Sequence, residues 1–202
     1  QHIKRERATS NICTASALMA SMVGFYCVYN GPEGLRRAAE TAHLAAATVA
    51  RALEAMDYRL ASKEFFDTLE VEAEAAVVQS LALEQGINFY YPSEGRVRMS
   101  FDEVTTAAEI ETVVSIFAAA KGKKAKAVKA VTESCVPTAL RRQSPYLQEP
   151  VFNAYRSESA LMRYIKKLEL RDISLANSMI SLGSCTMKLN ACLLYTSPSP
   201  RD

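Results

Sequence analysis

The sequence contains no tryptophan, only two histidines and no pair of cysteines in a C-x-x-C spacing. His2 and His43 are too few and too far apart in sequence to indicate a metal centre. The five cysteines are scattered and odd in number, which fits neither a zinc site nor a disulfide framework and favours reduced thiols. A strong charge is also lacking, because the formal net charge is +2. Electrostatics alone therefore give no argument for a nucleic-acid or membrane-surface partner.

The sequence also lacks an initiating methionine, so we expect an internal piece of a longer protein. Residues 11–32 carry no charge and follow a basic stretch, as in a signal sequence. Polar residues dilute this run, however, and its apolar residues fall on one stripe. That arrangement favours a buried amphipathic helix over a helix in lipid.

Two helices are predicted from this stripe and the residues that follow it. Ser10 or Asn11 can cap a first helix that runs to about residue 29. Asn30-Gly31 ends that helix, and Pro32 suits the first position of a second helix that runs to about residue 56. The face expected to be buried in the first helix is Ala15, Leu18, Met19, Met22, Val23 and Tyr26. In the second it is Leu35, Ala42, Ala46, Val49, Leu53 and Met56.

The middle of the chain alternates between strand and helix patterns. The predicted elements are a strand at 65–71, a helix at 73–84 closed by Gly86, a hairpin of strands 87–91 and 96–101, and a helix capped by Thr105 or Thr106. The apolar stripe of that last helix is Ile110, Val113, Val114 and Phe117. This order predicts a compact α+β unit, in which helices pack on an antiparallel sheet.

The character of the sequence changes at residue 121. A Lys/Ala run and then Pro137, Pro145 and Pro150 predict a linker or a connection across the surface. The basic clusters at residues 4–7 and 121–129 are predicted to be solvated surface. Residues 157–168 are again predicted to be helical, with the stripe Leu161, Met162, Ile165 and Leu168.

The segment at residues 179–190, MISLGSCTMKLN, is small, hydroxyl-rich and glycine-containing. Ser184, Cys185 and Thr186 offer small side chains and exposed backbone N–H groups, which suit a phosphate or a carboxylate. Lys188 and Asn190 can add a charge and an amide. A helix cap with ordinary packing explains the same residues, so the pattern alone leaves both interpretations open.

Two stretches resemble the P-proteins of the glycine cleavage system. One is QHIKRERATSNICTA at residues 1–15, continued by YNGPEGL at 29–35, and the other lies within residues 151–191 and includes GSCTMKLNA at 183–191. FFDTL at residues 65–69 also fits. Because TSNICTA and GSCTMKLN are long and unusual, chance is a poor explanation, and the resemblance spans residues 1–191.

The resemblance implies a fold. P-proteins consist of two related halves with the aspartate-aminotransferase-like fold (fold type I) of pyridoxal-phosphate enzymes. We therefore expect residues 1–130 to be the α+β small domain that ends the first half, residues 131–156 to be a linker, and residues 157–191 to open the catalytic half. Residues 192–202, CLLYTSPSPRD, look like translated sequencing adapter, with a natural disordered tail as the alternative.

The resemblance also implies an oxidoreductase activity for the parent protein. P-proteins decarboxylate glycine with pyridoxal phosphate and transfer the aminomethyl group to the lipoyl arm of the H-protein. The expected partners are glycine, the H-protein, the other half of the P-protein and a second copy, without nucleic acid or membrane. The compartment is the cytoplasm in bacteria or the mitochondrial matrix in eukaryotes.

Only the second half of a P-protein holds the cofactor lysine, which is expected downstream of this chain. We therefore expect this chain to contain no catalytic residue, to hold no cofactor covalently, and to be inactive alone. Lys188 is interpreted as a structural or anion-contacting residue rather than the cofactor lysine.

Two groups of residues are expected to line the cofactor site by this resemblance. The first is Ser184, Cys185, Thr186, Lys188 and Asn190. The second is Thr9, Ser10, Asn11 and Thr14, which match the position where the related half places small hydroxyl residues near the cofactor phosphate. A helix N-cap at Ser10 or Asn11 explains the second group equally well. Cys13 lies in the same motif, and a thiol near a helix start can be redox-sensitive.

The sequence departs from the family at three positions. The family usually has histidine where Asn30 and Arg156 stand, and proline where Ser181 stands. An arginine at position 156 does not titrate near neutrality, which argues against proton transfer there. The alternatives to an enzyme segment are an α+β module for dimerisation or partner docking, and a separate non-catalytic subunit. Because the chain contains both TSNICTA and GSCTMKLN, the separate subunit is disfavoured.

Overall fold

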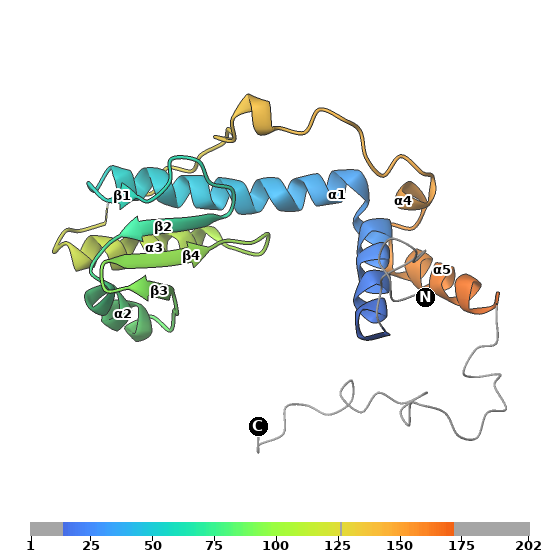
Figure 1. The fold of residues 1–202 in the computed structure, drawn as a ribbon, viewed down its shortest axis with the longest axis horizontal. Helices are drawn as coiled ribbons and strands as arrows, with labels where there is room; N and C mark the ends of the chain where they lie inside the picture. The colour runs from blue at the N-terminus through green and yellow to red at the C-terminus, as the bar shows by residue number, and fades with distance from the viewer. Residues whose placement is uncertain (1–13, 126, 172–202) are drawn as a thin grey trace, which may run out of the picture. The chain divides into compact units, whose positions relative to one another are not determined.

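The computed structural model describes residues 14–125 and 127–171, with side chains from residue 16 onward. The chain divides into two compact units. The sheet unit is Pro32–Gln148, and the terminal unit combines Gln1–Gly31 with Glu149–Asp202. The ribbon in Figure 1 labels the elements of both units.

Helix α1, Thr14–Glu54, is interrupted at Gly31, whose φ of 63° and ψ of −179° are not helical. A side chain at this position would overlap the guanidinium of Arg156 and the carbonyl oxygen of Phe152. Gly31 therefore supplies both the positive φ and the space that the break requires. The predicted end at Asn30-Gly31 and restart at Pro32 are confirmed, and the second part of α1 belongs to the sheet unit.

The strands of the sheet unit form one antiparallel sheet in the order β1-β2-β4-β3. They are β1, Arg59–Leu60; β2, Thr68–Glu72; β3, Tyr90–Ser93; and β4, Arg96–Ser100. Leu69 pairs with Met99 and Val71 with Val97, and all four side chains are buried. Because side chains alternate along a strand, Glu70 and its partner Arg98 lie on the opposite face. One face of the sheet therefore contributes to the core, and the other carries charges.

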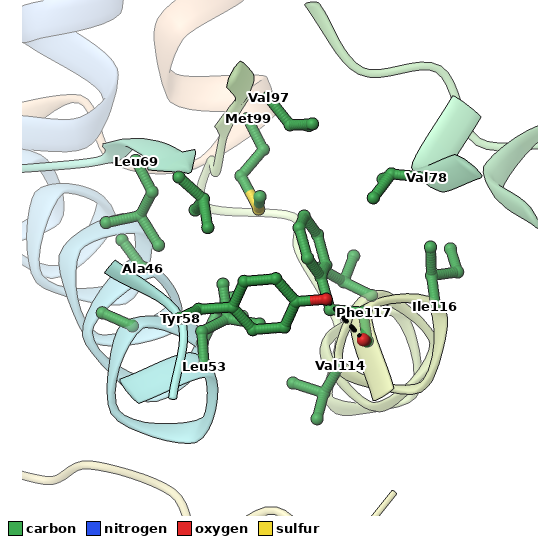
Figure 2. Packing of buried hydrophobic residues seen from close by; sticks show 14 of the residues in the cluster. Ala46, Leu53, Tyr58, Leu69, Val78, Val97, Met99, Val114, Ile116 and Phe117 are labelled. Atoms are coloured by element: carbon green, nitrogen blue, oxygen red, sulfur yellow. Dashed lines mark hydrogen bonds between the residues drawn. The ribbon is translucent and has the colours of Figure 1, made fainter. Parts of the chain in front are cut away.

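Helices α2, Ala75–Glu84, and α3, Ala107–Ala120, pack against each other beside the sheet. Helix α3 begins with a capping box, in which Thr106 and Glu109 each bond the backbone N–H of the other. Figure 2 shows Phe117 of α3 and Leu53 of α1 in one cluster with Leu69 of β2. The Tyr58 hydroxyl donates a 2.8 Å hydrogen bond to the Phe117 carbonyl.

The predicted α+β class and antiparallel sheet are confirmed. The hairpin, the helix closed by Gly86 and the helix capped at Thr106 all form within a few residues of their predicted bounds. Strand β1 has no predicted counterpart because it is two residues long. The predicted buried face of the second helix is confirmed at Ala42, Ala46, Val49 and Leu53.

The terminal unit contains the first part of α1 together with α4, Val151–Ala154, and α5, Glu158–Glu169. Ser157 caps α5 through a 3.3 Å hydrogen bond from the Ala160 N–H. The buried face predicted for the first helix is wrong for this structure, because Leu18 is 67%, Met22 53% and Val23 60% exposed. Met162 and Ile165 of the predicted α5 stripe are also exposed. The periodicity correctly marks an apolar face, but no described residue covers it.

The segment from residue 122 to residue 148, called the strap here, has little regular structure. It contains a short 3₁₀ helix at Thr138–Leu140, and residue 126 lies outside the description. Figure 1 shows the strap running back along the second part of α1. Within the described residues, no helix has both the length and the apolarity needed to cross a membrane.

Candidate functional site

The candidate residues named from the sequence lie outside the described residues. These are Thr9, Ser10, Asn11, Ser184, Cys185, Thr186, Lys188 and Asn190. Thr14 is the first residue of α1, but its side chain is not described. Cys13 and Ser181 also fall outside. The structure therefore does not test these predictions, and the described part of the chain offers other features.

The strap is fastened to α1 at residues far apart in sequence. The backbone N–H of Val131 donates a 3.0 Å hydrogen bond to the Thr48 hydroxyl, which itself donates to the Leu44 carbonyl at 2.7 Å. Val131 and Thr48 are only 6% and 5% exposed. This bond satisfies a buried backbone donor in a segment that has no sheet or helix to satisfy it.

A second attachment is made by His43, which is 2% exposed. Its Nε2 accepts a 3.1 Å hydrogen bond from the backbone N–H of Cys135, and its Nδ1 lies 2.8 Å from the Phe66 carbonyl oxygen. The Cys135 sulfur lies 3.4 Å from the same Nε2. The imidazole also stacks on the Phe66 ring, with centroids 5.5 Å apart.

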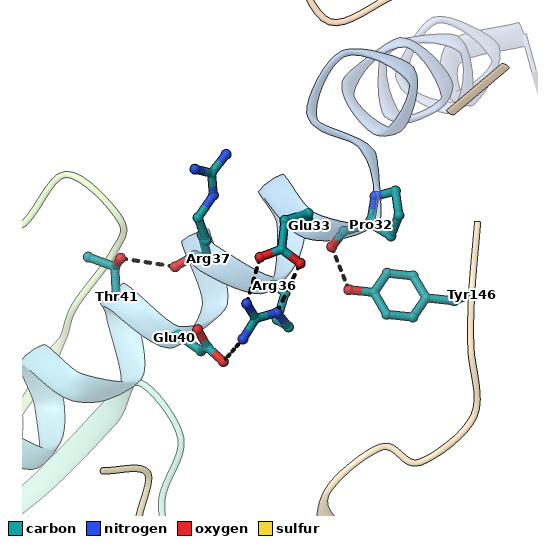
Figure 3. Close-up of polar contacts among 7 residues, drawn as sticks. All are labelled: Pro32, Glu33, Arg36, Arg37, Glu40, Thr41 and Tyr146. Atoms are coloured by element: carbon teal, nitrogen blue, oxygen red, sulfur yellow. Dashed lines mark hydrogen bonds and ion pairs between the residues drawn. The ribbon is translucent and has the colours of Figure 1, made fainter. Parts of the chain in front are cut away.

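The third attachment is at the start of the second part of α1. The Tyr146 hydroxyl donates a 2.7 Å hydrogen bond to the Pro32 carbonyl, as Figure 3 shows. Nearby, Arg36 forms ion pairs with Glu33 at 2.6 Å and Glu40 at 2.5 Å on the surface of the helix. As the strap proceeds from Val131 to Tyr146, its attachments move back along α1 from Thr48 to Pro32.

A pocket of about 510 Å³ lies where α1 ends and the strap begins. Residues of α1, α3 and the strap line it: Thr48, Arg51, Ala52, Ala55, Met56, Val114, Lys123, Lys124, Ala127, Val128 and Lys129. Most of these side chains are apolar, and four carry a positive charge. None of the described residues that line the pocket is acidic.

Two lysines hold the end of α1 beside this pocket. Lys121 donates to the carbonyls of Met56 and Asp57 at 2.8 and 2.7 Å, and its ammonium lies 4.0 Å from the centroid of the Tyr58 ring. Lys123 pairs with the Asp57 carboxylate at 3.2 Å. Both carbonyls lie in the turn that directly follows α1, so the charge of Lys121 also complements the negative end of the helix dipole.

Pyridoxal phosphate needs backbone N–H groups or cations around its phosphate, commonly at a helix N-terminus. At the start of α3 the N–H groups of Thr106 and Glu109 are already bonded by the capping box, and at α5 the Ser157 side chain bonds the Ala160 N–H. Glu74 is the N-cap residue of α2, and its negative charge disfavours a phosphate at that helix start. The helix starts α2, α3 and α5 therefore do not fit this cofactor. The described residues also hold no cluster of three or more side chains suited to a metal ion.

Comparison with known proteins shows the family of the chain. A sequence model of the family described as "Glycine cleavage system P-protein" matches residues 1–117, which is more than half of the chain. A protein of Flavobacterium johnsoniae named "Glycine dehydrogenase (decarboxylating)" is 50% identical over 192 residues, or 95% of the chain. The chain belongs to the glycine cleavage system P-protein family.

Other members are similarly close. Proteins of the same name from Thermosynechococcus vestitus and Vibrio cholerae are 46% and 45% identical over 95% of the chain. The chain spans about one fifth of these relatives, at 20% of their length. A crystal structure titled as an inhibitor-bound glycine decarboxylase (P-protein) of the glycine cleavage system matches 59% of the chain and 30% of its own, with 26% identity and a TM-score of 0.47.

Two of the three departures from the P-protein pattern fall within the described residues. Arg156 donates a 2.5 Å hydrogen bond to the Asn153 side chain and lies beside Gly31. Asn30 donates from its side chain to the Tyr26 carbonyl at 3.0 Å. Both side chains therefore serve the local structure around the helix break.

From the sequence, His43 serves only to exclude a metal centre, and its attachment to the strap is not predicted. A signal exists, because His43 lies between Ala42 and Ala46 on the predicted buried face of the helix. A buried histidine there needs hydrogen-bond partners for both nitrogens. No local pattern identifies Phe66 and Cys135 as those partners.

Proposed function

We propose that this chain is a segment of a P-protein that decarboxylates glycine and transfers the aminomethyl group to the lipoyl arm of the H-protein. The observation that supports this proposal is the identity of 45–50% over 95% of the chain to proteins named glycine dehydrogenase (decarboxylating). Since the chain corresponds to 20% of the length of those relatives, the activity requires the longer polypeptide.

The chain contributes to the active site through its two family motifs. Ser184, Cys185, Thr186, Lys188 and Asn190 line the cofactor site, with Thr9, Ser10, Asn11 and Thr14 as a second group. Pyridoxal phosphate, when bound, supplies the electron sink for loss of the carboxylate. The halves of the parent have the fold of type I pyridoxal-phosphate enzymes, and the sheet unit belongs to the small domain that ends the first half.

The isolated chain is inactive in this proposal, and its surface supports that view. Leu18, Met19, Met22 and Val23 are each more than half exposed on α1. A row of large apolar side chains on one helix face is typical of a surface that another part of the protein covers. The rest of the P-protein is the natural cover.

A chimaera tests the proposal. Residues 1–191 of this chain replace the matching segment of the Flavobacterium johnsoniae protein, and release of CO₂ from glycine is measured with lipoylated H-protein. The chimaera is expected to retain activity, while the 202-residue chain alone gives neither activity nor a visible-absorbing complex with pyridoxal phosphate. A soluble chimaera that binds the cofactor but releases no CO₂ contradicts the proposal. So does a stoichiometric absorbing complex of the chain alone.

A further inference from the structure

We propose that the pocket between α1, α3 and the strap binds a small amphipathic anion. The ligand has an apolar body of a few rings or a short acyl chain, and it carries a carboxylate, phosphate or sulfonate group. This inference goes beyond the proposed function, which uses none of the residues that line the pocket.

The size of the pocket and its apolar walls define the body of the ligand. Its volume of about 510 Å³ lies within the range of pockets that hold small molecules, roughly 300–1,000 Å³. Its apolar lining includes Ala52 of α1, Met56 just after that helix, Val128 of the strap and Val114 of α3, which is 2% exposed. An extended protein segment or a membrane surface needs a longer groove or a flat face, so a small molecule is the better match.

The charge around the pocket defines the other end of the ligand. Arg51, Lys124 and Lys129 have no ion-pair or hydrogen-bond partner among the described residues for their charged groups, and only Lys123 is paired, with Asp57. These cations come from segments more than 70 residues apart in sequence and meet at one apolar hollow. An anion in the hollow is attracted by all of them, and the apolar walls reduce the screening by water.

The wall that the strap contributes is held on both sides. Lys121 and Lys123 bond the turn that follows α1, where the pocket lining of the strap begins, and Val131 bonds Thr48 just after that lining ends. A binding wall that is fixed in advance loses less entropy when a ligand binds. The strap residues 127–129 therefore belong to the site in the free protein.

Two fluorescent probes with the same rings test this proposal on the whole chain. 8-Anilinonaphthalene-1-sulfonate carries the anion, and N-phenyl-1-naphthylamine is the same body without it. The chain is expected to bind one sulfonate probe saturably. The triple variant Arg51→Gln, Lys124→Gln, Lys129→Gln is expected to weaken that binding by about tenfold and to change binding of the neutral probe by less than about twofold. Ala52→Phe, which fills the pocket, is expected to weaken both.

The matched control removes three positive charges elsewhere. Arg37→Gln, Lys63→Gln, Arg171→Gln changes three exposed side chains outside the pocket and gives the same net charge as the pocket variant. Equal weakening by the two triple variants would mean that only the overall charge attracts the probe, and it would overturn the proposal. Equal weakening of both probes by the pocket triple variant overturns the proposal as well. So does binding of the sulfonate probe that neither Ala52→Phe nor the pocket triple variant changes, which would indicate binding to the exposed face of α1.

Circular dichroism establishes that each variant is folded. If the triple variant unfolds, the single variant Lys124→Gln replaces it, since this side chain is exposed and has no described partner. This variant is expected to weaken binding of the sulfonate probe by roughly threefold, which is the effect expected from one partly screened charge. An unchanged affinity in this folded single variant counts against the proposal.

Discussion

His43 accepts the backbone N–H of Cys135 at its Nε2, so one buried side chain joins residues 92 positions apart. A carbonyl oxygen can only accept, and therefore the Nδ1 that faces Phe66 carries the ring proton. One ring nitrogen therefore donates and the other accepts. An N–H at Nε2 would face the N–H of Cys135, so the two hydrogen bonds together select the tautomer with its N–H at Nδ1.

The attachment of the strap at Thr48 predicts a difference between two similar substitutions. Thr48→Val keeps the shape but removes the acceptor, and it leaves the buried N–H of Val131 without a partner. The expected loss is about 1–3 kcal/mol of unfolding free energy, with faster hydrogen exchange at the Val131 amide. Thr48→Ser keeps the hydroxyl and is expected to retain the protection of that amide. Equal exchange in both variants would show that the bond does not hold the strap.

The hydrogen bond from Tyr58 to the Phe117 carbonyl predicts a smaller loss. This carbonyl lies in the last turn of α3, where helix carbonyls lack their usual partners. Tyr58→Phe keeps the edge-to-face contact with the Phe117 ring and removes only the hydroxyl. Urea unfolding is expected to show a loss of about 0.5–1.5 kcal/mol. Tyr90→Phe, at a tyrosine 62% exposed, is the control and should be close to neutral.

The two glycines of the first part of α1 predict opposite effects of the same substitution. Gly31→Ala forces a positive φ on alanine, at about 1–2 kcal/mol, and brings its side chain onto Arg156 and Phe152. Gly24→Ala meets nothing within 4 Å and is expected to stabilise the helix by about 0.5–1 kcal/mol. Thermal unfolding of both variants measures the contrast.

A third variant separates the two causes at Gly31. Arg156→Ala removes the overlapping guanidinium, so in that background Gly31→Ala is expected to cost less. The strain of the positive φ and the overlap with the Phe152 carbonyl remain, and complete recovery of stability would contradict the strain argument.

The charged face of the sheet predicts a dependence of stability on pH. Hydrogen bonds from Arg98 and then Arg96 hold the pKa of the Glu70 carboxyl below its ordinary value. The unfolded chain therefore binds a proton more readily, so the contribution of Glu70 is present above its ordinary pKa and is lost as pH falls through the folded value. The difference in unfolding free energy between the wild type and Glu70→Gln should shrink between about pH 6 and pH 3.

A second variant tests the cause of this pKa shift. Arg98→Gln keeps the carboxylate and removes the larger cause, so the pH dependence that Glu70 contributes should be reduced in it as well. A pH profile identical to the wild type would mean that Arg98 does not set the pKa of Glu70.

Local rules predict the elements whose causes are local. Gly31 with Pro32 marks the helix break, Gly86 closes α2 with a φ of 69°, and Thr106 caps α3. Each of these residues acts on its immediate neighbours, so the sequence contains the whole argument. The same holds for the buried face of the second part of α1, where periodicity identifies Val49 and Leu53 correctly.

Features that depend on distant residues are not predictable in this way. The described lysines after residue 120 are exposed, as the composition predicts, but no local pattern shows that Lys121 bonds the turn after α1 or that Lys123 pairs with Asp57. Likewise, periodicity finds the apolar face of the first part of α1 but not what covers it. The candidate residues around GSCTMKLN remain predictions, since they lie outside the described residues.

The attachments of the strap also bear on the order in which the sheet unit forms. Val131, Cys135 and Tyr146 bond residues 83, 92 and 114 positions earlier, so each contact closes a very long loop. Such contacts add little stability until α1 and the sheet have formed, because closing a long loop costs entropy. During synthesis on the ribosome, the strap residues also emerge after α1 and the sheet. The strap should therefore dock after the rate-limiting step of folding. In that case Thr48→Val accelerates unfolding in stopped-flow experiments and leaves the refolding rate unchanged.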